Sequence, residues 1–293
     1  MAETPIVTRF APSPTGLLHV GHAYSAHLAF ETAIASGGRF LLRIEDIDTT
    51  RCRPEFETAI LEDLTWLGLT WETPVRRQSE HFEDYRAALA RLDEMSVLYP
   101  CFCTRAEIAA EIARSPSAPH GPEGPLYPGT CRSLSRDERR ARIEAGDPYA
   151  LRLDVSPATA RVAGVLSWQD RHAGRVIAQP ESLGDVVLAR KDVPASYHLA
   201  SVVDDHLQGI TLVVRGMDLF QATHVHKLLQ ALLGYETPAY HHHGLLLDAD
   251  GKRFAKRDTS VTLASLRAHG VDPKTLLEQL QPGRIPWTTP GEA

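Results

Sequence analysis

Residues 9–22 read RFAPSPTGLLHVGH, and this stretch decides the fold. The β-prone residues before it predict a buried strand, and its Pro/Gly-rich centre predicts a tight loop. From Val20 to about Ile34 the apolar residues follow a helical period. The start of such a helix offers backbone N–H groups and the positive end of the helix dipole, which suit a polyphosphate. We therefore expect His19 and His22, which flank Val20 and Gly21, to lie at an anion site.

The composition is that of a globular protein. The chain has 293 residues, of which 43% are hydrophobic and 23% charged, enough for one or two domains. The net charge of −6 gives no sign of a protein that binds nucleic acid, and no DNA partner is expected, although a local basic patch is enough for contact with nucleic acid. No apolar run approaches the roughly 20 residues that a membrane helix requires. Because residues 1–8 form no basic or apolar leader, we expect a cytoplasmic protein with no membrane partner.

Strands alternate with helices in the first third of the chain. Residues 39–44 are predicted to form a second buried strand, which ends in the acidic run 45–48. Pro54 then opens a helix with an apolar face, and another helix fits residues 80–97. This alternation predicts an α/β fold with a parallel, Rossmann-like sheet for nucleotide binding.

The pattern changes at about residue 98. The next part holds a Pro/Gly/Ser-rich stretch, a basic helix opened by a capping box at Ser135–Glu138, and short strands predicted near 149–154 and 161–168. The basic helix is predicted to be a solvated face. The α/β texture then returns with a helix at about 195–207, a strand at 210–214 and a helix at 218–233. We therefore divide the chain into the two halves of one catalytic domain (1–97 and 184–239), an inserted module (98–183) and a final segment with a hairpin-like stretch and two short helices (240–293).

Three cysteines fall in the predicted insert. Cys101 and Cys103 are one residue apart, and Cys131 follows later. Three thiolates and a fourth protein ligand would close a tetrahedral zinc site, which would be structural because no position stays open. Ordinary unligated thiols are the alternative, and His120 is a chemically suitable fourth ligand. Cys52 lies in another region and is predicted to be an unpaired thiol.

Two further polar runs invite a functional interpretation. Residues 253–257 read RFAKR, and by itself such a basic segment is typical of a solvated surface loop. The run His241–His243 suggests a metal cluster, but adjacent residues of a strand point to opposite faces. We therefore predict a structural role for these histidines.

Together these stretches resemble a known family. The segment APSPTG followed by HVGH at residues 19–22 resembles the HIGH motif of class I aminoacyl-tRNA synthetases, in the form found in the glutamyl/glutaminyl subfamily. RFAKR resembles the KMSKS loop of the same enzymes, with Arg253 in place of the first lysine and Ala255 in place of the serine. The resemblance implies attack of an amino-acid carboxylate on the α-phosphate of ATP, held with Mg²⁺, with pyrophosphate leaving. It implies catalytic roles for His19, His22 and Lys256, and ATP binding by His19, Gly21, His22, Arg253 and Lys256.

A glutamate substrate sets its own demands on the site. Its two carboxylates need cations, above all arginines, and its ammonium group needs an acid. Charged residues stand where predicted strands begin or end, although each by itself fits a surface ion pair. The resemblance implies that Arg9 and Arg215 contact substrate carboxylate and that Glu45 holds the amine. It assigns the whole glutamate site to Arg9, Ala11, Ser13, Glu45, Tyr197 and Arg215.

The resemblance also reaches the insert and the end of the chain. Short paralogues of glutamyl-tRNA synthetase place a tyrosine as fourth zinc ligand at the position of Tyr127, which completes the set Cys101, Cys103, Tyr127 and Cys131. Only two short helices, at about 263–269 and 273–280, fit after the KMSKS-like loop, so no anticodon-binding domain is expected. Such paralogues activate L-glutamate without tRNA and attach it to queuosine in the anticodon of tRNA-Asp. The alternatives are a minimal synthetase that charges the tRNA 3′ end and a catalytically silent RNA-binding paralogue, against which the intact charged residues argue.

Overall fold

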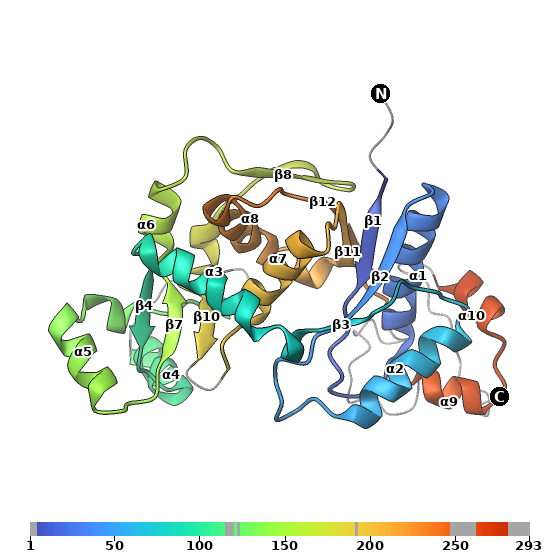
Figure 1. Cartoon of the computed structure of the whole chain (residues 1–293), viewed down its shortest axis with the longest axis horizontal. Helices are drawn as coiled ribbons and strands as arrows, with labels where there is room; N and C mark the ends of the chain where they lie inside the picture. Colours follow the sequence, from blue (N-terminus) through green and yellow to red (C-terminus); the bar gives the residue numbers. More distant parts are fainter. Residues whose placement is uncertain (1–4, 115–119, 122–123, 191–192, 247–261, 281–293) are drawn as a thin grey trace.

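The N-terminal stretch forms the centre of a parallel sheet. The computed structural model describes residues 5–114, 120–121, 124–190, 193–246 and 262–280. β1 (Val7–Phe10) pairs in parallel with β2 (Arg39–Ile44), and β2 with β3 (Arg76–Arg77). On its other side β1 lies beside β11 (Leu212–Gly216), where the N–H of Thr211 donates to the carbonyl oxygen of Val7 at 3.0 Å. β11 continues in parallel to β12 (Ala239–His243), and β12 to β8 (Ser167–Asp170), which pairs with β9 (Gly174–Ile177) in antiparallel. The parallel α/β sheet expected from the sequence is therefore confirmed (Figure 1).

One face of the sheet is covered by α1 (Val20–Ala35), with α2 (Pro54–Trp66) and the two short helices α9 (Leu263–Ala268) and α10 (Pro273–Gln279) around it. Fully buried alanines along α1 let its backbone approach the strands closely: Ala23, Ala26, Ala29 and Ala33. The helix ends at Ser36, and Gly37, with a φ of 63°, turns the chain towards β2.

The other face carries α7 (Tyr197–Leu207) and α8 (Ala222–Leu233), with α3 (Phe82–Glu94) packed on both. Successive side chains of a strand point to opposite faces. On β2, therefore, Leu42 and Ile44 join the core beneath α1, while Arg43 reaches α7. The same alternation turns Arg9 of β1 and Arg215 of β11 towards α7 and α8. Three arginines from three parallel strands thus share one face.

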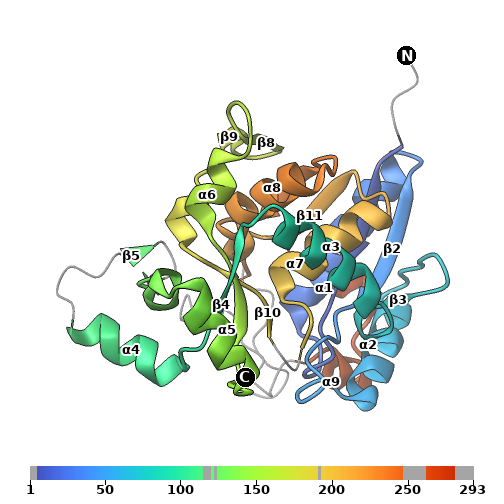
Figure 2. The ribbon, with the colours of Figure 1, turned by 60° about the vertical axis from the view of Figure 1, so that its left-hand side comes forward.

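A smaller module adjoins this body and lies to the left in Figures 1 and 2. Its antiparallel sheet has the order β10–β7–β4. The capping box predicted at Ser135 is confirmed: Ser135 Oγ accepts the N–H of Glu138 at 3.2 Å, and Glu138 Oε2 accepts the N–H of Ser135 at 2.7 Å. The helix that it opens, α5, has no buried residue and is the predicted solvated face. The module comprises β4 (Leu98–Cys101), α4 (Arg105–Arg114), β5 (His120–Gly121), β6 (Gly124–Pro125), α5 (Arg136–Glu144), β7 (Ala150–Leu153), α6 (Val155–Ala160) and β10 (Val187–Arg190).

Strand pairing moves several segments across the predicted divisions. β8 and β9 lie within 98–183 yet belong to the main sheet, whereas β10 lies after residue 184 and pairs in the module. β12, predicted as part of a hairpin, is a strand of the main sheet. A buried parallel strand is usually recognised by a run of apolar residues, and the three histidines of β12 interrupt such a run. The strand predicted at 161–168 begins only at Ser167, since residues 161–166 form turns and irregular structure after α6. The division of the chain into folding units at 1–97, 98–183, 184–239 and 240–293 stays a prediction.

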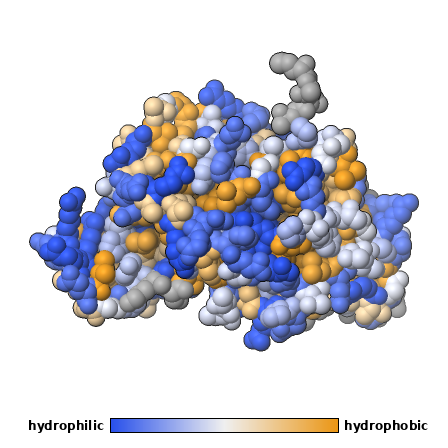
Figure 3. All heavy atoms as spheres, in the orientation of Figure 1, coloured by the Kyte–Doolittle hydropathy of each residue, from blue (hydrophilic) through white to orange (hydrophobic). Residues whose placement is uncertain are grey.

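The surface shows mixed character. On the face drawn in Figure 3, hydrophilic residues gather over the middle and apolar residues lie between them. In the described part of the chain, no helix combines the length and apolar character that crossing a bilayer demands.

Candidate active site

The two predicted histidines stand at the N-terminus of α1. Nδ1 of His19 accepts the N–H of Gly21 at 3.1 Å, and Nδ1 of His22 accepts the N–H of His19 at 3.2 Å. In a neutral imidazole this leaves the hydrogen on Nε2, so each ring can donate to a phosphate oxygen. A Cβ on Gly21 would lie 3.0 Å from Cε1 of His19, so the glycine keeps room for the ring. The arrangement suits an anion at a helix N-terminus.

A cavity of about 510 Å³ opens beside these histidines. Its floor is formed by the carboxyl ends of β1 and β11 and by the loop before α1, the place where α/β folds bind ligands. It brings together every predicted glutamate and ATP residue in the described part of the chain: Arg9, Ala11, Ser13, His19, Gly21, His22, Glu45, Tyr197 and Arg215. Residues about 200 positions apart in sequence thus share one cavity.

Arg9 enters the cavity already paired. Its Nε lies 2.9 Å from Oδ1 of Asp205 on α7, and both side chains are at least nine-tenths buried. NH1 of Arg43 donates to the same oxygen at 2.8 Å, and NH2 of Arg43 lies 3.1 Å from Oε1 of Glu45. Asp204 completes the network, with Oδ2 3.6 Å from Nε of Arg43. This ion network fixes Arg9 and Glu45 at the edge of the cavity.

Burial and charge pull the carboxylates of this network in different directions. Burial raises the pKa of Glu45, although Arg43 and Arg9 oppose the shift. Burial would also raise the pKa of Asp205, but Arg9 and Arg43 hold it below its usual range. Asp205 is therefore ionised at neutral pH, whereas burial works against the ionised form of Glu45. A substrate ammonium group beside Glu45 would favour its ionised form.

Arg215 has different surroundings. Its NH1 donates to the hydroxyl of Tyr197 at 2.9 Å, and its NH2 donates to Oγ1 of Thr223 at 2.7 Å. Its Nε lies 3.1 Å from Nε2 of His242. Among the residues that the structure describes, no carboxylate forms an ion pair with this buried cation, which is 5% exposed. A buried cation held by neutral groups is a suitable partner for a carboxylate of a ligand.

The basic segment falls outside the described residues, and with it Arg253 and Lys256. Both of its flanks are anchored at the cavity. Leu246 lines the cavity on one side. On the other, Thr262 forms a β-bridge with His19, and the N–H of Leu263 donates to the carbonyl oxygen of Leu18 at 2.8 Å. Lys256 stands only six residues before the contact with His19.

Sequence reasoning missed the buried groups behind the cavity. Arg43, Asp204 and Asp205 are internal to predicted elements and carry no motif, but charged residues within apolar segments are a usable signal, because burial without a partner is costly. Thr223 was missed as well, and His242 was predicted only to have a structural role. Among the described residues, the one group suited to a metal ion consists of cysteines, and His241–His243 stay a predicted structural element.

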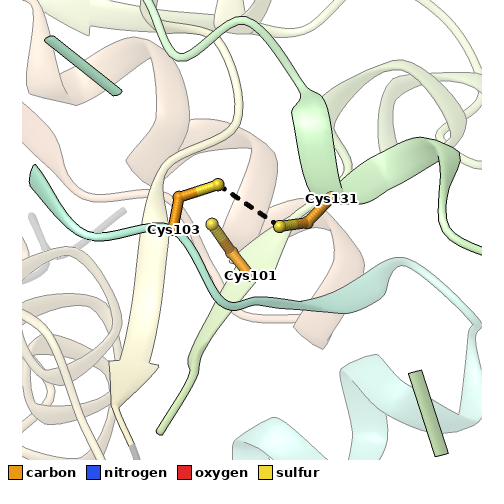
Figure 4. Close-up of side chains that lie close together, drawn as sticks. All are labelled: Cys101, Cys103 and Cys131. Carbon is orange, nitrogen blue, oxygen red and sulfur yellow. Dashed lines mark hydrogen bonds between the residues drawn. The ribbon is translucent and has the colours of Figure 1, made fainter. Parts of the chain in front are cut away.

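The cysteines of the module gather at one point. The Sγ atoms of Cys101, Cys103 and Cys131 point towards one another, and they lie within 4.8 Å (Figure 4). Sγ of Cys103 is 3.4 Å from Sγ of Cys131, and the hydroxyl of Tyr127 is 3.3 Å from Sγ of Cys101 and 3.7 Å from Sγ of Cys103. Tetrahedral zinc with bonds of about 2.3 Å to sulfur separates its ligands by about 3.5–3.8 Å. The four donor atoms therefore fit such an ion.

The remaining candidates for this site differ in standing. His120 lies on β5, whose side chains are outside the described part, and it stays the predicted alternative to Tyr127 as fourth zinc ligand. Cys52 is half-buried, forms no disulfide and does not belong to the cysteine cluster, which consists of Cys101, Cys103 and Cys131.

The fold and site define a class I tRNA synthetase. The chain belongs to the family described as tRNA synthetases class I (E and Q), catalytic domain, whose model matches residues 5–292. It is thus an enzyme of the tRNA synthetase ligase family. Within it, the chain is 48% identical to the glutamyl-Q tRNA(Asp) synthetase of Rhodobacter capsulatus, over 92% of this chain and 97% of that protein. It is 46% identical to the glutamyl-Q tRNA(Asp) synthetase of Symbiobacterium thermophilum, over 93% and 84%.

A solved structure agrees with this placement. The crystal structure of a glutamate tRNA ligase from Elizabethkingia meningosepticum, in complex with its amino acid, matches with a TM-score of 0.78 and 28% identity. The match covers 94% of this chain and 60% of that one. The chain thus has the catalytic fold of a glutamate-specific synthetase, and it spans only part of that longer ligase.

Proposed function

We propose that this enzyme activates L-glutamate with ATP, without tRNA, and transfers the glutamyl group to queuosine in the anticodon of tRNA-Asp. The observation that carries the first step is the cavity, which unites the predicted glutamate residues with the histidines at the N-terminus of α1. The second step rests on the similarity to proteins named glutamyl-Q tRNA(Asp) synthetase. Because its substrates are ATP, glutamate and tRNA, we place this enzyme in the cytoplasm.

The geometry suggests how activation proceeds. Arg215 and Arg9 bind substrate carboxylate, and Glu45 accepts a hydrogen bond from the ammonium group. A carboxylate oxygen of glutamate attacks the α-phosphorus of ATP, the bond to the bridging oxygen breaks, and pyrophosphate leaves. The negative charge that builds on the phosphates is stabilised by hydrogen bonds from His19, His22 and Lys256. ATP binding also involves Gly21 and Arg253, and the ATP would carry a Mg²⁺ ion. In the transfer, a hydroxyl of the queuosine diol attacks the acyl carbon, and AMP leaves.

A structural zinc ion in the module is part of this proposal. Cys101, Cys103, Cys131 and Tyr127 would hold it, and the supporting observation is the spacing of their donor atoms. Burial raises the pKa of the Cys103 thiol to about 12, and a bound zinc ion would supply the positive charge that stabilises its thiolate. The ion would join the segment around Cys101 and Cys103 to the segment of Tyr127 and Cys131, which pack together with Tyr99 and Phe102 in one small cluster.

Two assays separate the steps. Glutamate-dependent ATP–pyrophosphate exchange without tRNA is expected for the wild type, and its absence would overturn the activation step. Labelled glutamate should then appear only on tRNA that contains queuosine, and periodate cleavage of the diol should abolish the labelling. Equal labelling of tRNA with and without queuosine would instead show charging of the 3′ end. Arg175→Gln, on the exposed strand β9, is a matched control for Arg215→Gln, which should lose exchange.

A further inference from the structure

Arg215 is held from behind by the neighbouring strand. In the register of β11 and β12, Arg215 lies opposite His242, and both point to the face of α7 and α8. His242 is fully buried, and its Nε2 is 3.1 Å from Nε of Arg215. Because an arginine Nε–H only donates, Nε2 of His242 must be the acceptor.

A carboxylate fixes which nitrogen of His242 carries the hydrogen. Nδ1 of His242 lies 2.6 Å from Oδ2 of Asp170 on β8, which is also fully buried. Oδ1 of Asp170 accepts the backbone N–H groups of His172 at 2.8 Å and Ala173 at 2.9 Å, so the carboxylate itself does not turn. An ionised carboxylate only accepts, so Nδ1 carries the hydrogen and Nε2 presents its lone pair to Arg215.

The charge state is consistent with this tautomer. Burial and the positive charge of Arg215 lower the pKa of His242 to about 4, although Asp170 opposes the shift. The pKa of Asp170 is below its usual range, because the N–H groups of Ala173 and His172 and the ring of His242 outweigh the effect of burial. At neutral pH the chain of contacts is therefore a carboxylate, a neutral imidazole and a guanidinium.

We infer that Asp170 and His242 are positioning residues that aim the guanidinium of Arg215 at a substrate carboxylate. The inference rests on the proposed function, in which Arg215 binds glutamate. Tyr197 and Thr223 hold the two terminal nitrogens, and His242 holds the third, so that the plane of the guanidinium is determined. The carboxylate of Asp170 reaches Arg215 only through the ring of His242. The carboxylate-binding edge of the guanidinium is therefore not neutralised by direct contact with an acid.

The expected phenotype is a selective loss of glutamate binding. An oriented arginine holds the substrate carboxylate before and during the reaction alike, so its misplacement raises KM for glutamate and leaves kcat nearly unchanged. We expect His242→Asn, which can keep the contact with Asp170 but no longer reaches Arg215, to raise KM for glutamate about tenfold or more in ATP–pyrophosphate exchange. KM for ATP should change by less than about twofold. His242→Gln restores an acceptor near the position of Nε2 and should recover part of the loss.

Asp170→Asn is the sharper variant because it has the same shape. The amide oxygen can still accept the two backbone N–H groups, so the amide NH₂ then faces Nδ1 of His242. The ring must move its hydrogen to Nε2, where it opposes the Nε–H of Arg215. Asp170→Asn should therefore raise KM for glutamate as much as His242→Asn, and the double variant should be no worse than either single one.

His224→Asn is the matched control. His224 is a buried histidine of α8 whose Nδ1 accepts the N–H of Gln179 at 2.9 Å, away from Arg215. It should lower the melting temperature without a specific rise in KM for glutamate. An unchanged KM for glutamate in either Asp170→Asn or His242→Asn would overturn the inference, as would equal rises in KM for glutamate and ATP. No exchange by the wild type would instead refute the proposed function itself.

Discussion

Replacing Asp205 by asparagine tests the ion network behind the cavity. Asp205 is 6% exposed and accepts hydrogen bonds from Arg9 at 2.9 Å and from Arg43 at 2.8 Å. Asparagine preserves the shape but removes the negative charge that the two guanidinium groups share. Removal of one member of a buried ion pair costs about 3–5 kcal/mol. Because Asp204 and Glu45 still compensate Arg43, we expect a loss near the lower end, about 3 kcal/mol of unfolding free energy.

The loss should depend on pH with a definite sign. Arg9 and Arg43 outweigh burial and hold the pKa of Asp205 below its unfolded value near 3.8. The folded chain therefore favours the ionised form, and the stabilisation is complete above the unfolded pKa. It is lost as the pH falls through the lowered, folded pKa. The difference between wild type and Asp205→Asn should be full at pH 7 and shrink below about pH 4.

Urea unfolding followed by circular dichroism measures this difference. Glu72→Gln is the control, because the pair of Arg39 and Glu72 has the same chemistry but its side chains are 52% and 44% exposed. An exposed pair is worth less than about 1 kcal/mol. If Asp205→Asn lost no more stability than Glu72→Gln at pH 7, the reasoning that the buried network supports the cavity would be refuted.

Three further predictions concern other parts of the chain. Asp63 is fully buried on α2, and burial raises its pKa from 3.8 to about 6, although Arg267 opposes the shift. In urea unfolding, Asp63→Asn should therefore stabilise the protein by up to about 3 kcal/mol at pH 8 and by little near pH 4. Equal effects at both pH values would contradict this prediction. Chelation of zinc should lower the melting temperature, and Tyr127→Phe should weaken zinc retention; a metal-free protein of unchanged stability would exclude the zinc site. Lys256→Ala should lower ATP–pyrophosphate exchange by about 10²–10³-fold, whereas a rate like that of the wild type would remove Lys256 from the reaction.

The sequence predicted the elements whose local signals agree with their surroundings. The loop and helix of residues 9–34 have turn residues, a helical period and a capping histidine, and the structure forms α1 where these signals place it. The helix opened by Ser135 begins at its capping box. Local hydrogen bonds decide such boundaries, so neighbouring residues are sufficient to predict them.

The parts that were predicted poorly depend on distant partners. β12 contains three histidines and has no apolar pattern, and its fully buried His242 bonds to Asp170 and Arg215 rather than packing in a hydrocarbon core. β8 was assigned to the module because neighbouring segments pair there, but it joins β12 through a single parallel register. Arg43 was missed because its partners are also distant in sequence: only Glu45 is near, directly after β2, and the other two acidic partners lie on α7, more than 160 positions later. Pairing across such distances leaves little trace in a short window of sequence.

The position of β1 has a consequence for synthesis on the ribosome. Val7 of β1 contacts Thr211 before β11, 204 positions downstream. At about 5–20 residues per second, one edge of β1 waits on the order of 10–40 s for its neighbour. An unpaired edge invites association with other nascent chains, and a charged residue that points inward discourages it. Until Asp205 has been made, Arg9 lacks this partner, and its charge then disfavours pairing of the open edge of β1 with another chain.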